Sequence, residues 1–559
     1  MTLRVALCYP NRPAVGRANL GLAIVRDLLA TLGQPLAIEE RYAGGPRRAQ
    51  RPLDHFDLIV CSVPFEGDYP RLIELLVAGG VEPLAARRPD GPSVLVGGMA
   101  PTLNPEPLAL IADLIAIGEA EELLPELTAT IGPLLRARAR RDEMLSAAAE
   151  VSGVYVPDRL RFEYDAAGRI AGIGGAQPGR ELPRVARRWI ADLDRAGATA
   201  PVIADDEVFA GCAVIEATRG CLWGCRFCAA GFAQRPFRQR RQEALWPDVE
   251  RALGLRRRVG LVGADLGDLN GLPELTRRIH AAGGTLTPSA LRATAVDAAL
   301  AQALAASGKK LATLAPETGS ERLRRLINKP ISDEKLLAAV DELAGAGIES
   351  IRLYFMIGLP TETDDDVAAM VALGQRARSQ LLQHGRRRGR VGGVTLSVTP
   401  FVPKPATPFQ WEPVCDAATL KRRMRLLRRA GAGVANLEIK VEPLAATREQ
   451  AILSRADRRI GALLVEAVER RVPLRRLLDD HPEICGPPLA GFGEKDLLPW
   501  QQVDHGAGRD YLWRERQRAF AGQITPPCDL GRCNACALEC GERARSPREL
   551  DGSAGQTAS

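Results

Sequence analysis

Three cysteines within eight residues constrain this chain more than any other feature. Cys221, Cys225 and Cys228 have the spacing CxxxCxxC. Three thiolates at this spacing can bind three irons of a [4Fe–4S] cube and leave the fourth iron open for a further ligand. A structural zinc site is the alternative, but it needs four protein ligands, and the nearest other cysteine, Cys212, lies within a predicted strand. The spacing therefore favours an open iron–sulfur site.

A second group of cysteines lies near the C-terminus. Its members have the spacing CxxxxCxxCxxxC and are Cys528, Cys533, Cys536 and Cys540. Four thiolates can hold either zinc or an auxiliary [4Fe–4S] cluster. The compact single segment favours iron–sulfur, because a zinc ribbon uses two separated pairs. A disulfide-tied tail conflicts with the reducing cytoplasm that we expect for this chain.

The sequence predicts no membrane-spanning segment. With 46% hydrophobic and 26% charged residues, the 559-residue sequence is typical of a globular protein of several domains. No signal-peptide-like segment opens it, and no run of about 18 apolar residues occurs, so we expect a cytoplasmic location and no membrane contact. The net charge of +7 is modest, with basic residues concentrated at 386–390 and 421–429. A solvated surface is the simpler interpretation of these runs, and RNA is the alternative partner.

Residues 1–135 alternate short apolar runs with helical patterns, which predicts a Rossmann-like, doubly wound α/β domain. The expected buried strands are residues 4–8, 57–61, 93–96 and 114–117. Gly97 and Gly98 directly follow the third of these, where such sheets bind ligands. Residues 136–210 are predicted to be a linker with a small hairpin, whose strands are residues 154–157 and 160–164 and whose turn lies at residues 167–168.

The same alternation resumes over residues 211–400 and predicts a partial (β/α)6 TIM barrel. The six expected strands are residues 212–217, 259–262, 284–288, 311–315, 350–356 and 393–398. The cysteine loop follows the first strand, so we expect it at the carboxyl-end mouth of the barrel. The remaining segments are a mostly helical C-terminal region over 401–525, a cysteine-rich metal-binding segment over 526–545 and a disordered tail over 546–559.

With these features the chain resembles radical S-adenosylmethionine (radical SAM) enzymes, in particular the subgroup with an N-terminal cobalamin-binding-like domain. Besides the cysteine triad, the resemblance rests on Phe227 before the last thiol. It also rests on runs near the ends of the later strands, at residues 288–292, 314–321, 354–363 and 398–405. A softer similarity extends over nearly the whole chain to an uncharacterised family of large radical SAM proteins, through residues 9–12, 65–70, 103–106 and 498–500 and the cysteine-rich tail.

The resemblance implies a chemistry and a set of binding residues. A [4Fe–4S] cluster with SAM on its fourth iron generates a 5′-deoxyadenosyl radical, which takes a hydrogen atom from the substrate. By analogy, Ser289 and Arg292 contact the methionine carboxylate of SAM, and Glu317 contacts its ribose or amino group. Gly358 and Pro360 belong to a turn that lets the backbone approach the adenine. The structural alternatives are a helix N-terminal carboxylate for Glu317 and a surface ion pair for Arg292.

The chain departs from the resemblance at the second barrel strand. Many relatives carry Gly-Gly-Glu there, whereas this chain has Gly-Ala-Asp-Leu-Gly-Asp over 263–268. Either Asp265 or Asp268 substitutes, or the amino group of SAM is held differently.

Cobalamin is the second cofactor that the resemblance raises. Gly97, Gly98 and Thr102 can line a slot for its nucleotide tail. The cobalt-ligating Asp-x-His-x-x-Gly motif is absent, and the only histidine of the domain, His55, precedes a strand, so we expect no histidine ligand from this domain. A domain that serves only as a scaffold is the alternative.

These features predict a radical SAM enzyme, with cobalamin-dependent methyl transfer as the leading reaction. A methylthiotransferase-like enzyme acting on RNA or protein is one alternative, although Cys8 and Cys61 are the only N-terminal cysteines available for the second cluster of that class. A non-catalytic iron–sulfur scaffold is the other. We expect a flavodoxin- or ferredoxin-type electron donor, and the sequence indicates neither the substrate nor the oligomeric state.

Overall fold

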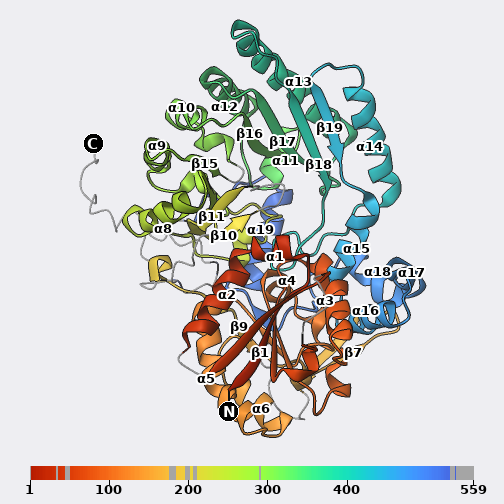
Figure 1. The fold of residues 1–559 in the computed structure, drawn as a ribbon. Coiled ribbons are helices and arrows are strands. Elements are labelled where there is room, and N and C mark those ends of the chain that lie inside the picture. The colour runs from red at the N-terminus through yellow and green to blue at the C-terminus, as the bar shows by residue number, and fades with distance from the viewer. Residues whose placement is uncertain are drawn as a thin grey trace, which may run out of the picture.

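The computed structural model describes residues 2–32, 35–44, 51–175, 184–195, 202–204, 211–288, 291–528, 536 and 540. Figure 1 shows a mixed α/β chain in which an N-terminal body, drawn in red and orange, lies below a central body that runs from yellow to cyan. The C-terminal helices, in blue, lie against both. Parallel strands dominate the two bodies.

The N-terminal body contains a six-stranded sheet with the order β2-β1-β3-β4-β5-β6. Its strands are β1 (Leu3–Tyr9), β2 (Leu36–Tyr42), β3 (Leu58–Ser62), β4 (Ser93–Gly97), β5 (Leu114–Ala116) and β6 (Val154–Tyr155). The first five are parallel, and β6 runs antiparallel to β5. The four predicted strands form because each is an apolar run buried on both faces. The edge strand β2 was not predicted, since Glu39, Glu40 and Arg41 interrupt its apolar run.

Helices cover both faces of this sheet. One face packs against α2 (Leu20–Thr31), α5 (Ala120–Arg136) and α6 (Arg141–Ala148). The other packs against α3 (Tyr69–Ala78) together with α15 (Leu444–Arg455) and α16 (Arg459–Glu469), which come from the far end of the chain. Two short helices, α1 (Pro13–Arg17) and α4 (Met99–Leu103), follow β1 and β4. The core of the N-terminal body is therefore completed by C-terminal residues.

Residues 136–175 are more than a linker. α6 and β6 belong to the N-terminal sheet, so this body extends past the predicted boundary at residue 135. A hairpin forms around the predicted turn from β7 (Leu160–Tyr164) and β8 (Ile170–Gly175), whereas residues 154–155, expected as its other strand, pair with β5 as β6. Beyond it, β9 (Val185–Ala186) pairs with β20 (Val503–Asp504), and β10 (Val202–Ala204) pairs antiparallel with β11.

The central body has two four-stranded sheets with the orders β10-β11-β14-β15 and β16-β17-β18-β19. An isolated bridge between Leu291 and Leu314 joins them. Apart from β10, the strands are β11 (Cys212–Glu216), β14 (Arg258–Val262), β15 (Thr285–Pro288), β16 (Leu311–Glu317), β17 (Ser350–Ile357), β18 (Val394–Pro400) and β19 (Leu437–Val441). All six predicted strands form, whereas β10 and β19 were not predicted.

Helices alternate with these strands and share one apolar core with them. They are α8 (Gln242–Leu255), α9 (Leu272–Ala281), α10 (Ala298–Ala306), α12 (Asp333–Ala346), α13 (Asp364–Arg387) and α14 (Ala417–Gly431). The short helix α11 (Glu321–Leu326) packs in a separate cluster through Leu323 and Leu326. Capping explains where the long helices begin: Thr363 and Asp366 form a capping box at α13, and Ser332 caps α12. The last helices are α17 (Leu474–Asp480), α18 (Pro482–Ala490) and α19 (Arg509–Phe520).

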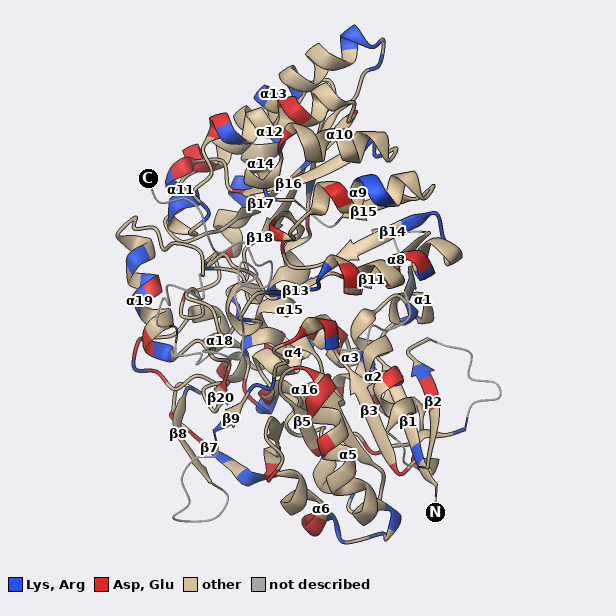
Figure 2. Cartoon of the chain, turned by 90° about the vertical axis from the view of Figure 1, so that its left-hand side faces the viewer, with Lys and Arg blue, Asp and Glu red and all other residues tan. Residues whose placement is uncertain are grey.

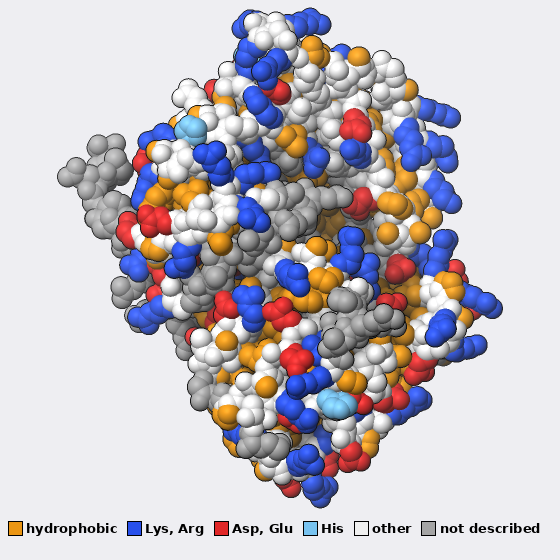
Figure 3. Space-filling model, viewed as in Figure 1, with side chains coloured by type: hydrophobic (Ala, Val, Ile, Leu, Met, Phe, Trp, Pro, Cys, Tyr) orange, Lys and Arg blue, Asp and Glu red, His pale blue; other side chains and the backbone are white. Residues whose placement is uncertain are grey.

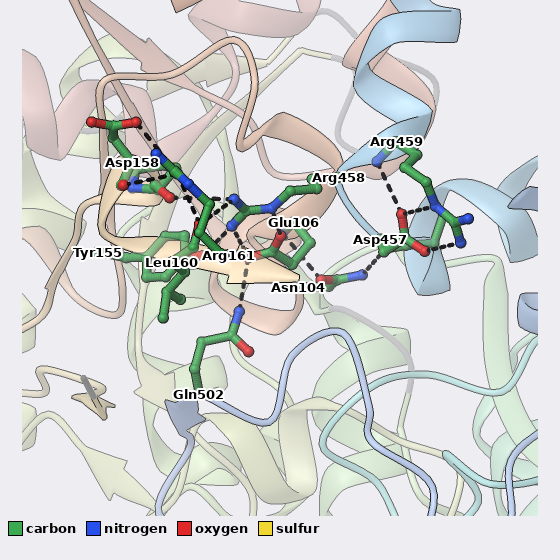
Figure 4. Close-up of polar contacts among 12 residues, drawn as sticks. Asn104, Glu106, Tyr155, Asp158, Leu160, Arg161, Asp457, Arg458, Arg459 and Gln502 are labelled. Atoms are coloured by element: carbon green, nitrogen blue, oxygen red, sulfur yellow. Dashed lines mark hydrogen bonds and ion pairs between the residues drawn. The ribbon is translucent and has the colours of Figure 1, made fainter. Parts of the chain in front are cut away.

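A buried polar cluster centred on Glu106 joins the N-terminal body to the hairpin and the C-terminal helices (Figure 4). Its carboxylate accepts hydrogen bonds from Tyr155, from Arg458 at 2.7 Å and from Gln502 at 2.9 Å. Asn104 donates to the carbonyl of Ala456 at 2.9 Å. The residues 103–106 that the sequence singled out therefore act in this structure as a junction.

Figure 2 shows that the helices carry charged residues of both signs. Figure 3 shows Lys and Arg side chains along the edge formed by α14, where Lys421, Arg422, Arg425, Arg428 and Arg429 are exposed. Among the described residues, no helix is long and apolar enough to cross a membrane.

Candidate functional site

The cysteine triad lies on the loop between β12 (Thr218–Arg219) and α7 (Ala230–Ala233), beyond the carboxyl end of β11. Cys225 is buried, and Cys221 and Cys228 are half-buried. Burial and the neighbouring Cys225 and Cys228 raise the pKa of the Cys221 thiol, and burial beside Cys225 raises that of Cys228. The three thiols are thus close enough to interact electrostatically, as ligands of one cluster must be. No three His, Cys, Asp or Glu side chains in the described ranges are grouped so as to hold a single metal ion.

Arg292 lies directly against this loop. Its guanidinium carbon is 3.9 Å from the centroid of the Trp223 ring, and its Nη1 donates to Cys225 Sγ at 3.7 Å. The side chain is buried, so it is not a surface ion pair, and its Nε has no hydrogen-bond partner although it lies 3.7 Å from Asp265. A buried guanidinium with a free donor beside the thiols suits an anionic ligand.

The two aspartates after β14 both face the site. Asp268 accepts a hydrogen bond from Trp223 Nε1 at 2.8 Å, so it orients the cysteine loop. Asp265 is buried, and burial together with the nearby Asp268 raises its pKa to about 6. Asp265 also accepts a hydrogen bond from the Gly267 amide at 3.0 Å, so both aspartates are held in place beside the cysteine loop.

Glu317 ends β16 with a left-handed φ of 67°, where the pairing with β17 shifts its register. Its carboxylate accepts a hydrogen bond from Lys329 Nζ at 2.9 Å, and Lys329 is only 5% exposed. The structural alternative for Glu317, a helix N-terminal carboxylate, is wrong, because the helix that follows is capped by Ser320. Lys329 was missed, because an isolated lysine before a proline carries no motif.

The turn after β17 is stabilised by a hydrogen bond between two of its own residues. Gly358 has a φ of 88°, and its amide donates to Glu362 at 2.7 Å, with Pro360 half-buried in the same turn. Burial raises the pKa of Glu362 to about 7, although Arg423 lies 2.8 Å away. Ser289 lies outside the described residues.

Buried hydroxyls in the central body add to the binding potential. Thr218 and Thr287, on β12 and β15, have hydroxyl oxygens with no hydrogen-bond partner. Buried polar groups are normally satisfied, so a polar ligand or a water molecule is the natural partner for them.

A cavity of about 240 Å³ lies between the N-terminal sheet and the segment that leads into the cysteine loop. Gly97, Gly98 and Thr102 line it from the N-terminal side, and Arg219 and Gln234 from the other. Its apolar wall includes Leu20, Ile24, Val25, Leu123 and Leu124. Only glycine fits at position 98, because its φ is 121° and a Cβ would lie 2.5 Å from the Val63 carbonyl oxygen.

Charged residues tie this cavity to the cysteine loop. Arg219, two residues before Cys221, forms ion pairs with Glu119 at 2.9 Å, Glu121 at 2.8 Å and Glu216 at 2.7 Å. Burial of Glu119 disfavours its charged form, but the nearby Arg238 and Arg219 lower the pKa of Glu119 to about 2. The cavity wall and the thiol loop are therefore joined by one charged network.

The two histidines near the N-terminal body have different surroundings. His55 is exposed, lies just before β3 at the edge opposite the cavity, and contacts Asp54 at 2.8 Å. His505 is buried and lies 2.9 Å, through Nε2, from the Thr102 carbonyl. The sequence could not find this contact, because about 400 residues separate the two partners.

The C-terminal cysteines begin beside the first group. The Cys528 amide donates to the Leu222 carbonyl at 2.7 Å, within the cysteine loop. Cys536 is buried beside Phe232 and Tyr511. Cys540 is half-buried, and Cys533 lies outside the described residues.

Comparison with known proteins identifies two regions of the chain. Residues 46–157 match the family model of the N-terminal region of radical SAM proteins, and residues 215–374 match that of the radical SAM superfamily. An uncharacterized protein from Methanocaldococcus jannaschii is 26% identical over 472 residues, which cover 83% of this chain and 91% of that protein.

Solved structures show more distant similarity. The radical SAM methyltransferase TsrM from Kitasatospora setae, solved with cobalamin and a [4Fe–4S] cluster, matches with 17% identity and a TM-score of 0.48, over 71% of this chain and 72% of TsrM. The cobalamin-dependent enzyme OxsB matches with 15% identity and a TM-score of 0.46, over 68% of this chain and 53% of OxsB.

Proposed function

This chain is a radical SAM enzyme, and we propose that Cys221, Cys225 and Cys228 hold the [4Fe–4S] cluster of that class. The observation that carries the proposal is the loop itself: three thiols, one buried and two half-buried, with no fourth cysteine in their run, lie beside Arg292 within the matched domain. When bound, the cluster supplies the electron that cleaves SAM and produces the 5′-deoxyadenosyl radical. Consistent with this, we propose that residues 211–400 are a partial (β/α)6 barrel and that the N-terminal sheet is Rossmann-like.

The residues around the loop suit the zwitterionic end of SAM. We propose that Arg292, with Ser289, holds the carboxylate and that Asp265 accepts from the amino group. Support comes from the free Nε of Arg292 and from the burial of Asp265 next to it. Glu317, oriented by Lys329, is the proposed partner of the ribose, and the turn at Gly358 and Pro360 borders the adenine.

We propose that the cavity at Gly97, Gly98 and Thr102 binds cobalamin and that the enzyme transfers a methyl group. A cavity with one apolar and one charged wall, joined to the cysteine loop through Arg219, supports this proposal over a scaffold role. A methylthiotransferase-like reaction is less well supported. Cys8 and Cys61 are buried opposite each other on β1 and β3, and the described strands of that sheet contain no third cysteine.

We also propose that Cys528, Cys533, Cys536 and Cys540 bind a second metal centre, either an auxiliary [4Fe–4S] cluster or zinc. The flavodoxin- or ferredoxin-type electron donor stays a prediction. RNA also stays a prediction, with the exposed basic face of α14 as its candidate surface.

Anaerobic reconstitution tests the central proposal. The wild type should contain about eight irons if both sites hold cubes, or about four with one zinc, and should form 5′-deoxyadenosine from SAM with dithionite. Replacing Cys221, Cys225 and Cys228 by Ala should remove about four irons and abolish this product. Cys485→Ala is the matched control, because this buried thiol lies in α18. Product formation by the triple variant would show that the cluster lies elsewhere.

A further inference from the structure

Arg226 is a fully buried residue inside the cysteine loop, between Cys225 and Cys228. Its Nη1 donates to the carbonyl of Leu326, at the end of α11, at 3.0 Å. Its Nη2 donates to the Gln523 carbonyl at 2.9 Å and lies 3.3 Å from the Glu515 carboxylate. The side chain therefore connects the loop to α19 and to the segment that follows it.

Glu515 is as deeply buried as Arg226. Besides Arg226, its carboxylate accepts hydrogen bonds from the Thr525 hydroxyl at 2.6 Å and from Arg518 at 2.8 Å. Removing the Glu515 charge would leave the buried Arg226 guanidinium uncompensated, which costs much free energy, whereas Arg518 would still face Glu515 if Arg226 were removed. The contact between the loop and α19 therefore depends most on the Glu515 charge.

A second connection runs through Asn328. Its Nδ2 donates to the carbonyls of Gly224 and Thr525, both at 3.0 Å, and its Oδ1 accepts from the Thr525 amide at 2.9 Å. Its φ of 56° lies in the left-handed region, which asparagine tolerates better than most residues. With the bond from the Cys528 amide to the Leu222 carbonyl, three separate contacts bind the loop to residues 515–528.

We propose that Arg226 is a positioning residue for the radical cluster. Together with Glu515 and Asn328, it holds residues 515–528 against the cysteine loop, and this packing fixes the backbone of the loop. The side chain of Arg226 does not contact the cluster or SAM in this role. It holds the backbone between Cys225 and Cys228, so that their thiols stay on one side of the loop. The inference depends on the proposed cluster at Cys221, Cys225 and Cys228.

The full-length chain, reconstituted anaerobically, is the test system. The variants are Arg226→Met, which removes the charge and all donors, Arg226→Lys, which keeps the charge, and Glu515→Gln, which keeps the shape of the partner. The readouts are iron retained during a chelator challenge and the change in the electron paramagnetic resonance signal of the reduced cluster when SAM is added. The second readout reports only a cluster with an open iron.

The matched control is Arg88→Met. Arg88 is equally buried, donates to main-chain carbonyls and pairs with Asp113 at 3.0 Å, but it lies in the N-terminal body. Removing either arginine should lower Tm by a similar amount. Loss of an outer-shell partner typically weakens metal affinity about 10- to 100-fold, and we expect a loss of that size for Arg226→Met and Glu515→Gln but not for Arg88→Met.

Arg226→Lys should recover part of the retention. If both Arg226→Met and Glu515→Gln keep iron and the SAM-dependent signal as the wild type does, or if Arg88→Met loses them equally, the proposed role is overturned. If Arg226→Met does not fold, Glu515→Gln alone decides between these outcomes. A wild type that assembles no SAM-responsive cluster would instead overturn the proposed function itself.

Discussion

Glu106→Gln should destabilise the chain far more than a typical substitution. The carboxylate is fully buried and meets donors from three parts of the chain: Tyr155, Arg458 and Gln502. Burial raises the pKa of Glu106, while Arg458 at 2.7 Å favours the charged form. The amide of Gln would leave the Arg458 guanidinium without its counter-charge and would turn an NH₂ group toward other donors.

The magnitude follows from the cost of breaking a buried ion pair. Removing one partner typically costs about 3–5 kcal/mol, and replacing both by apolar residues often costs little. We therefore expect about that loss for Glu106→Gln, with much of it recovered in Glu106→Gln/Arg458→Met. Urea unfolding followed by tryptophan fluorescence measures both, and the two single variants complete a double-mutant cycle.

An exposed ion pair provides the control. Arg140 and Asp142 are 3.2 Å apart but largely solvent-exposed, so Asp142→Asn should change stability by less than about 0.5 kcal/mol. A loss below about 1 kcal/mol for Glu106→Gln would show that the Glu106 cluster does not join the two ends of the chain as argued.

Two further predictions concern pH and the cavity. Burial lowers the pKa of His505 to about 4. In the unfolded chain the histidine binds a proton near pH 6.5, whereas in the folded chain it stays neutral down to about pH 4. The contribution of His505 to the free energy of unfolding is therefore fully present above pH 6.5 and falls by on the order of 3 kcal/mol as the pH drops toward 4. The dependence of Tm on pH should weaken in His505→Gln, and an unchanged profile would contradict the assigned burial. In equilibrium dialysis, Ala120→Trp should weaken cobalamin binding by filling the cavity, whereas the exposed His55→Ala should not. If the wild type, Ala120→Trp and His55→Ala bind cobalamin equally well, cobalamin binds elsewhere; if none of them binds it, cobalamin is not a ligand of this cavity.

The sequence alone determined the apolar strands and the position of the thiol loop, but not β2, β10 and β19. Strands such as β3 and β4 are short apolar runs, so their strand character is a property of the local sequence and was predicted. The same holds for the cysteine spacing and for its place after β11, since both depend on neighbours in the chain.

Tertiary structure decided which distant segments complete each part. α15 and α16 cover one face of the N-terminal sheet, about 350 residues from the strands they bury. Their amphipathic pattern predicts a helix but does not specify its partner.

The same reason explains the functional residues that were missed. Arg226 and Lys329 have no motif of their own, and only burial against Glu515 and Glu317 gives them a role. Local periodicity follows from the covalent spacing of side chains along the chain. The pairing of buried charges depends instead on which surfaces meet when water is excluded, and that is a property of the whole fold.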